Sequence, residues 1–364
     1  MRAELIRLLD RLLVTHSPTG DEREMDQACL DELGGICTRV WQDEAGNVIG
    51  LLEGETEAPP LRLMAHKDEI GALVARIDED GKMRLEPLGG ALAWIYGEGP
   101  LDVLGSEVIT GILGVGSMHT SDLSVDIQAA KTHRPLSWDV CRLDCKLNRQ
   151  QLAEKGVTVG TRVCISRARK VPLYLDDHVA GYGLDDKAGV AVLLIAAKML
   201  GEAGKRPTRD TYVCLTSAEE AGIAGGSFAA RTLPGDVAVA VEVAPVAPEY
   251  PVEPGPNPVI IYKDGQGIYD KGLSDELCAV AGELGLAPQR LAVRGFGSDA
   301  STIFKYGLAG RVAALAFPTE NTHGCEIAHL GSLLNCAKVV AAYLAGKPLR
   351  AARRPAKKGA KKRG

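Results

Sequence analysis

Residues 61–71 read Leu-Arg-Leu-Met-Ala-His-Lys-Asp-Glu-Ile-Gly, and the character of the chain changes where this stretch ends. Its first five residues are mostly apolar and predict a short buried strand that ends in His66. From Gly71 to Pro172, short β-like runs alternate with glycine-rich turns, a texture typical of a small β-barrel or sandwich. Beyond Pro172, strand and helix patterns alternate, which favours a layered α/β domain. The simplest fold is therefore an α/β domain built from both ends of the chain, with a small β-barrel domain inserted after the His66 strand.

The periodicity of apolar residues places the elements of this fold. In the α/β part we expect a mixed sheet with helices on both faces. The expected helices there cover residues 5–13, 21–33, 186–200, 273–284 and 327–344, and the expected strands cover residues 40–43, 48–52, 61–65, 211–215, 237–243 and 311–317. In the insert we expect strands at residues 73–77, 83–85, 108–115 and 162–165, and a helix at 148–155.

These patterns divide the chain into three parts. Residues 1–70 and 173–349 form the expected α/β domain, and residues 71–172 form the inserted β-domain. Residues 350–364 contain mainly Ala, Lys, Arg and Gly and predict a basic, disordered tail.

Composition excludes several classes of protein. Apolar residues make up 46% and charged residues 24% of the 364 positions, which is ordinary for a globular protein. The net charge is −5, and removing the eight basic residues of the tail leaves residues 1–349 at −13. Because residues 1–349 are acidic, they would bind the negatively charged backbone of nucleic acid poorly. We therefore expect no nucleic-acid partner. Nine cysteines without a Cys-x-x-Cys pair predict reduced thiols in a cytoplasmic protein. The longest apolar run, residues 188–197, is about half a membrane span and predicts no membrane partner.

Four short segments, at strand ends or tight turns, hold residues that could do chemistry. They are His66-x-Asp68, Gly183-Leu184-Asp185-Asp186, Glu219-Glu220 and the stretch 321–326 around His323. Each alone has an ordinary explanation, such as a helix N-cap or a charged helix start. Ligands gather at the carboxyl ends of strands in open α/β sheets. Four such segments on one predicted edge therefore indicate a metal site.

With residues 43–50 and 297–300 added in the same order, the chain resembles a known family. It is similar to the di-metal glutamyl and deblocking aminopeptidases of the tetrahedral TET type, some of which were once labelled endoglucanases. The resemblance covers about residues 3–346, including the insert. It implies a hydrolase, a metalloprotease that removes N-terminal residues from short peptides. It also implies two divalent ions per chain, zinc first and cobalt or manganese as alternatives, and a homo-oligomer between dimer and dodecamer whose dimer contact is made by the insert.

The resemblance also implies roles for individual residues. The implied metal ligands are His66, Asp185, Glu220, Glu242 and His323, with Asp185 bridging both ions. His66 and Glu242 would complete one site, and Glu220 and His323 the other. Glu219 would be the general base, and Asp68 would orient the His66 ring.

Five positions depart from the family pattern, and the first is Ala218, which replaces a usual polar residue before the Glu219-Glu220 pair. Glu242 stands where the family usually has Asp, and Ser298 stands where Thr is usual. Asn321 and Thr322 replace the common Arg-Tyr pair before His323. Glu242 keeps an alternative open, a related di-metal amidohydrolase such as a carboxypeptidase or an N-deacylase. A non-enzymatic assembly or nucleic-acid-binding protein with this fold is the other alternative.

Overall fold

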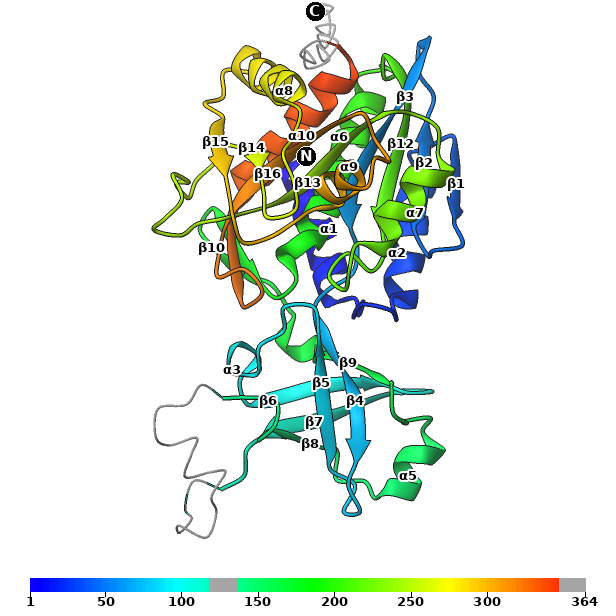
Figure 1. The fold of residues 1–364 in the computed structure, drawn as a ribbon, viewed down its shortest axis with the longest axis vertical. Helices are drawn as coiled ribbons and strands as arrows, with labels where there is room; N and C mark the ends of the chain where they lie inside the picture. The colour runs from blue at the N-terminus through cyan, green and yellow to red at the C-terminus, as the bar shows by residue number, and fades with distance from the viewer. Residues whose placement is uncertain (118, 120–135, 347–364) are drawn as a thin grey trace, which may run out of the picture.

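The computed structural model describes residues 1–117, 119 and 136–346, and Figure 1 shows them as two stacked parts. The upper part is a large mixed sheet with its helices, and the lower part is a closed β-barrel. The expected tail, residues 350–364, lies outside the described residues. Among the described helices, none has both the length and the hydropathy needed to span a bilayer.

Four parallel strands form the centre of the large sheet. They lie in the order β12 (Arg209–Thr216), β3 (Thr56–His66), β13 (Val237–Pro245) and β16 (Arg311–Glu320). Their nearly continuous apolar sequences are typical of parallel strands that are covered on both faces. The strands at the flanks are β1 (Arg39–Gln42), β2 (Val48–Leu52), β10 (Leu173–Leu175), β11 (His178–Gly181), β14 (Val259–Lys263), β15 (Gln289–Ala292) and β17 (Glu326–His329). Their pairings are antiparallel except that of β14 with β15, which is parallel.

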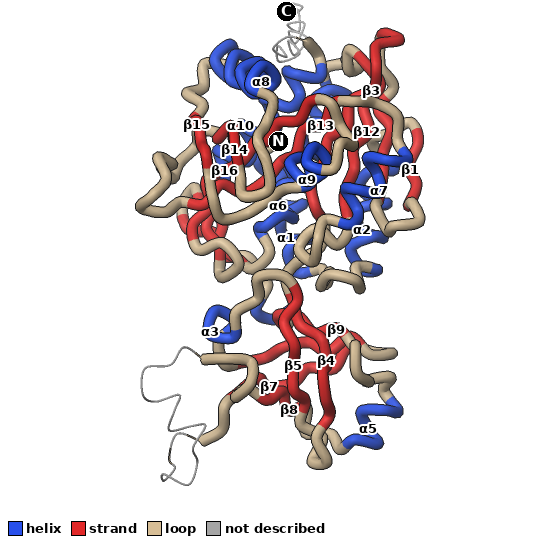
Figure 2. Tube along the Cα trace, viewed as in Figure 1, coloured by secondary structure: helices blue, strands red, loops and turns tan. Residues whose placement is uncertain are grey.

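Helices cover both faces of this sheet, as Figure 2 shows. One face is covered by α1 (Arg2–Val14), α2 (Arg23–Gly34), α6 (Leu184–Glu202), α8 (Lys271–Glu283) and α10 (Leu330–Leu344). The other is covered by α7 (Ala224–Thr232) and α9 (Asp299–Lys305). Along β3, Leu63 and Ala65 belong to the first core and Met64 to the second, the alternation that a strand produces.

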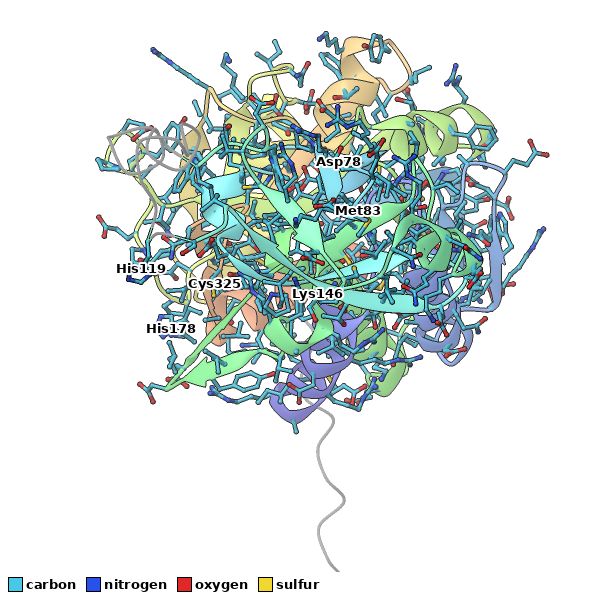
Figure 3. All side chains as sticks on the ribbon, turned by 90° about the horizontal axis from the view of Figure 1, so that it is seen from below. Asp78, Met83, His119, Lys146, His178 and Cys325 are labelled. Atoms are coloured by element: carbon cyan, nitrogen blue, oxygen red, sulfur yellow. The ribbon has the colours of Figure 1, made fainter. Side chains whose placement is uncertain are left out.

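The barrel follows directly after β3 and has its own core. Its strands are β4 (Gly71–Ile77), β5 (Met83–Leu88), β6 (Gly99–Leu104), β7 (Val108–Gly114), β8 (Arg142–Asp144) and β9 (Arg162–Ile165). Short helices accompany it: α3 (Ala93–Tyr96), α5 (Arg149–Glu154) and the 3₁₀ turn η1 (Arg167–Arg169). Viewed from below in Figure 3, the barrel residues Met83 and Lys146 lie in front of the large sheet.

The predicted fold class is confirmed, with a mixed sheet, helices on both faces and a closed six-stranded barrel. The domain boundaries at residues 70/71 and 172/173 stay predictions. One expected element is wrong, because the last helix begins at Leu330 and not at Ile327. Residues 326–329 form β17, which pairs with β11 and with the end of β16. Ile327 and Ala328 are apolar in either conformation, so periodicity alone did not separate the strand from the helix.

Candidate metal centre

The carboxyl ends of the four parallel strands meet at one edge of the sheet, where the barrel also begins (Figure 1). Six of the residues selected from the sequence lie at this edge. His66 ends β3, Glu219 and Glu220 follow β12, Glu242 lies in β13, His323 follows β16, and Asp185 lies at the start of α6. The fold thus brings together side chains that are up to 257 positions apart in the chain, from His66 to His323.

Five of these residues form two groups that share Asp185. The ligand atoms of His66, Asp185 and Glu242 lie within 4.8 Å of one another, and so do those of Asp185, Glu220 and His323. Nε2 of His66 lies 3.0 Å from Oδ1 of Asp185, and Nε2 of His323 lies 3.5 Å from Oδ2. Each oxygen of the Asp185 carboxylate therefore faces a different imidazole. This is the arrangement expected of a bridging ligand.

Glu219 and Asp68 lie beside these groups and outside them. Oε2 of Glu219 is 4.0 Å from Nε2 of His66. The carboxylate of Asp68 is 3.6 Å from Nδ1 of His66, whereas its main-chain oxygen is 3.2 Å away. The backbone oxygen is therefore the nearer partner of the ring. The Asp68 side chain instead accepts the backbone N–H groups of Glu219 and Glu220, at 3.0 and 3.2 Å.

We call Asp185, Glu219, Glu220, Glu242 and Glu326 together the acidic centre. Within the described part of the chain, none of these five carboxylates forms an ion pair with a Lys or Arg. Burial and neighbouring negative charge raise the pKa of Glu220 to about 7 and that of Glu326 to about 8. The same two causes raise the pKa values of Glu219 and Glu242 well above the usual range. Buried carboxylates without cations fit a site that a divalent ion would neutralise.

The pKa values of the two histidines move upward. Burial alone would lower the pKa of His323, but its hydrogen bond to Asp185 and the charge of Glu220 raise it to about 10. The pKa of His66 is raised in the same way, against burial, by Asp185 and Asp68. Both rings therefore attract a cation, either a proton or a metal ion, and the donor set suits borderline metals such as zinc.

The backbone is unusual next to the candidate ligands. His323 and Ala218, the residue before Glu219, adopt left-handed φ angles of 62° and 50°. Such conformations are uncommon for residues other than glycine and often occur at functional sites. The peptide bond between Asp185 and Asp186 is cis. Gly183 is the N-cap of α6, and no side chain among the described residues caps this helix, so Asp185 and Asp186 do not act as the simple N-cap that their positions also allowed.

Three buried acidic residues at this edge were not selected from the sequence. Oδ2 of Asp186 accepts the N–H of His66 at 3.2 Å, and Oδ2 of Asp299 accepts the hydroxyl of Thr216. Within the described ranges, their other carboxylate oxygens have no hydrogen-bond partner. Glu326 is the third. All three stand in or beside the quoted motifs, so proximity to a motif was the available signal.

The barrel supplies part of the wall of the centre. The turn after β5 brings Gly89 and Gly90 against Glu220 and His323, and a methyl group at position 90 would collide with the His323 ring. A small pocket opens beside Asp185, Glu220 and His323, and its apolar side chains are Ile70, Tyr96, Ile165 and Tyr182. Three of these four come from the barrel or its junction with the sheet, so the pocket belongs to both parts.

A second group of buried charges lies next to the first. Glu69 contacts the ammonium groups of Lys170 at 2.6 Å and Lys187 at 3.1 Å, and we call these three residues the lysine cluster. His16 and Cys164 also lie within metal-binding distance of Glu69. A divalent ion there would face two buried ammonium groups, so this set does not fit a metal.

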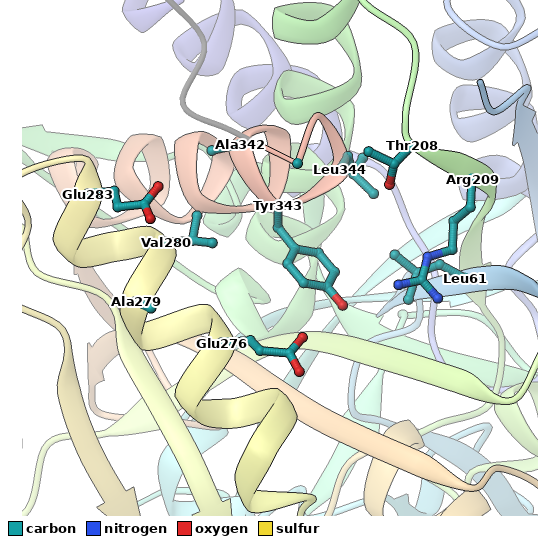
Figure 4. Close-up of a pocket in the computed structure, with 11 residues that line it drawn as sticks. Leu61, Thr208, Arg209, Glu276, Ala279, Val280, Glu283, Ala342, Tyr343 and Leu344 are labelled. Carbon is teal, nitrogen blue, oxygen red and sulfur yellow. The ribbon is translucent and has the colours of Figure 1, made fainter. Parts of the chain in front are cut away.

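Another hollow lies at the opposite end of the sheet, near the start of β3 (Figure 4). Its side chains come mainly from α8, α10 and the segment before β12, and include Glu276, Tyr343 and Arg209. None of the candidate site residues lines it. The chemistry indicated by the sequence therefore belongs to the acidic centre and not to this hollow.

Comparison with known proteins places this geometry in context. The family model described as M42 glutamyl aminopeptidase matches residues 46–339. A putative aminopeptidase from Acetivibrio thermocellus is 24% identical over 343 residues, covering 93% of this chain and 97% of that protein. An aminopeptidase structure from the archaeon Desulfurococcus kamchatkensis has a TM-score of 0.85 at 24% identity, over 95% of this chain and 96% of that one. The TET1 peptidase of Pyrococcus horikoshii, which can assemble into a tetrahedron or a large octahedral shell, has a TM-score of 0.81 at 24% identity, over 94% and 99%.

Proposed function

The chain belongs to the family of M42 glutamyl aminopeptidases, and on that premise we propose that it removes N-terminal residues from short peptides at the acidic centre. Membership makes it a metal-dependent peptidase and confirms the resemblance drawn from its motifs. The observation that carries the proposal is the pair of ligand groups sharing Asp185, because a two-ion hydrolase needs one carboxylate common to both sites.

We propose that two divalent ions bind here, with zinc as the natural occupant and cobalt or manganese as substitutes. His66 and Glu242 would hold one ion, Glu220 and His323 the other, and Asp185 both. When bound, such ions lower the pKa of a water molecule and polarise the scissile carbonyl. The extra methylene of Glu242, relative to the usual Asp, still leaves its carboxylate within the group.

Glu219 is the proposed general base. It lies next to the ligands without belonging to either group. Asp68 accepts the backbone N–H of Glu219, which fixes the main chain that carries the Glu219 carboxylate. Glu219 would take a proton from the attacking water and pass it to the leaving amine.

The small pocket beside the centre is the proposed site for the first residue of the peptide. Ile70, Tyr96, Ile165 and Tyr182 give it an apolar lining, while Asp185 and Glu220 carry negative charge at its inner end. A peptide's α-ammonium group complements that charge.

The wider organisation is also part of the proposal. We retain residues 1–70 and 173–349 as the catalytic domain and residues 71–172 as the insert that makes the dimer contact. The relatives that assemble into tetrahedral and octahedral particles support a homo-oligomer for this chain as well. All nine cysteines are unpaired, which supports a reducing compartment such as the cytoplasm.

The test is metal content and activity measured on one preparation. Elemental analysis of purified, undialysed protein is expected to find two ions per chain. Hydrolysis of amino-acid p-nitroanilides should stop with a chelator and return with zinc, cobalt or manganese. Preference for acetylated amino acids would instead favour the N-deacylase alternative. Protein that lacks metal and stays inactive with every added ion would contradict the proposal.

A further inference from the structure

Glu326 is a buried carboxylate that contacts the backbones of two candidate ligands. It is the first residue of β17 and is 1% exposed. Its Oε2 accepts the backbone N–H of Asp185, and its Oε1 accepts the backbone N–H of His323, each at 3.0 Å. The two ligands belong to separate segments, the start of α6 and the loop after β16, so a single side chain joins them.

The position of Glu326 is fixed independently of those contacts. β17 pairs with β11, where Glu326 stands opposite Gly181, and with the end of β16, where Ile327 stands opposite Glu320. β17 is therefore held on both sides, with Glu326 itself paired to β11 and the next residue paired to β16. Glu326 does not itself belong to either group of candidate ligands. The two hydrogen bonds of its side chain therefore fix the main chains of Asp185 and His323 relative to the sheet.

We propose that Glu326 is a positioning residue that fixes the main chains of Asp185 and His323 before any ion arrives. The inference rests on the proposed metal centre. Both oxygens of the Glu326 side chain accept a backbone N–H, so the main chain at each of the two ligands is held in one place. The need is greatest at His323, whose left-handed φ of 62° is held by this contact in a short loop.

Asp68 accepts backbone N–H groups in the same way on the other side of the acidic centre. Its two oxygens accept the N–H groups of Glu219 and Glu220, and Thr19 donates its hydroxyl at 2.8 Å. Two buried carboxylates therefore hold four of the main chains that surround the centre. Asp68 was expected from the resemblance, but Glu326 was not, and the matching pattern strengthens the case that the second contact is functional.

The experiment compares Glu326→Gln with the wild type. A glutamine keeps the shape but has one accepting oxygen, and its NH₂ group faces the other N–H, so one contact is lost. Metal-free protein is titrated with cobalt(II), whose visible absorption reports ligand geometry. We expect two phases in the wild type. In Glu326→Gln we expect about 10- to 100-fold weaker binding in the phase that His323→Ala abolishes and a smaller loss in the other phase, because Asp185 would ligate both ions. The matched control Glu320→Gln, a partly exposed residue that ends β16, should leave both phases unchanged.

The outcomes separate the possible roles. Unchanged cobalt phases in a folded Glu326→Gln protein would overturn the positioning role, and so would equal weakening of both phases together with a lower melting temperature of the metal-free protein. Wild-type protein that takes up no cobalt would instead contradict the proposed function itself.

A measurement on the wild type covers the case in which Glu326→Gln does not fold. Hydrogen exchange of the metal-free protein should find the amides of Asp185 and His323 protected, because both donate to a buried acceptor. Fast exchange at both amides would overturn the inference, since the ligands would then not be held before the ion binds.

Discussion

Two groups of buried charges lie side by side in this molecule. They differ in how the free-energy cost of burying charge is offset. In the lysine cluster, Glu69 has two ammonium partners, and Lys170 and Lys187 lower its pKa to about 2 against the effect of burial. In the acidic centre, burial and mutual repulsion raise the pKa of Glu220 to about 7. The first group carries its own counter-charges, and the second has to obtain them from outside the chain.

Because of this difference, we expect the lysine cluster to act in stability and the acidic centre to act in ligand binding. A group whose carboxylate is already paired with ammonium groups contributes to the stability of the folded protein and has no unpaired negative charge with which to bind a cation. A group with surplus negative charge is costly in the empty protein and binds cations for the same reason. Removing one carboxylate from each group should therefore have opposite consequences, which the following substitutions test.

The largest expected effect is on catalysis. Glu219→Gln should lower kcat by about 10² to 10⁴, the usual contribution of a general acid–base group. Both ions should remain bound, because Glu219 belongs to neither ligand group. Urea unfolding of the metal-free variant should give a free energy no lower than that of the wild type, since a buried acidic group has been removed. Full activity would exclude Glu219 as the base, and a large loss of stability would contradict the comparison.

Glu69→Gln should act on stability and leave the chemistry in place. The substitution leaves two buried ammonium groups without their carboxylate, a change that costs about 3 to 5 kcal/mol. Chemical denaturation of the two proteins at pH 7 measures the difference. The exposed barrel residue Glu86, changed to Gln, is the matched control and should unfold like the wild type. A loss of unfolding free energy below 1 kcal/mol in Glu69→Gln would mean that Glu69 does not stabilise the two ammonium groups of the lysine cluster.

The smallest expected effect is a pH dependence of that difference. The pKa of Glu69 is about 2 in the folded protein and 4.5 in the reference state. Its stabilisation is therefore complete above pH 4.5 and is lost as the pH falls through 2. Between pH 7 and pH 3, the gap in unfolding free energy between wild type and Glu69→Gln should shrink by about 2 kcal/mol. A gap that stays constant over this range would contradict the depressed pKa.

Parts of the centre could be predicted from local sequence because their signals are local. His66 ends an apolar strand, and Glu219 and Glu220 follow another, so strand-end logic selected them. Glu242 lies inside an apolar strand with no motif around it, and only the resemblance to a family indicated it. Glu326 acts through backbone contacts, which leave no recognisable spacing in the sequence.

The lysine cluster shows why the rest of the molecule could not be predicted. Glu69, Lys170 and Lys187 come from the exit of β3, the return from the barrel and the first turns of α6. Their pairing depends on how the barrel sits against the sheet, which no local pattern encodes. The same holds for β17, whose apolar residues suit a helix until its partners β11 and β16 are known.

The turn at Gly89 and Gly90 limits how this protein can be rebuilt. Because that turn fits against Glu220 and His323 with no room for a side chain at position 90, the barrel is not an exchangeable module. Deleting it would open one side of the centre to solvent, and a barrel grafted from a relative would have to place an equally small residue beside the histidine. Over evolutionary time, substitutions at this turn are therefore restricted by Glu220 and His323, the two side chains that it faces.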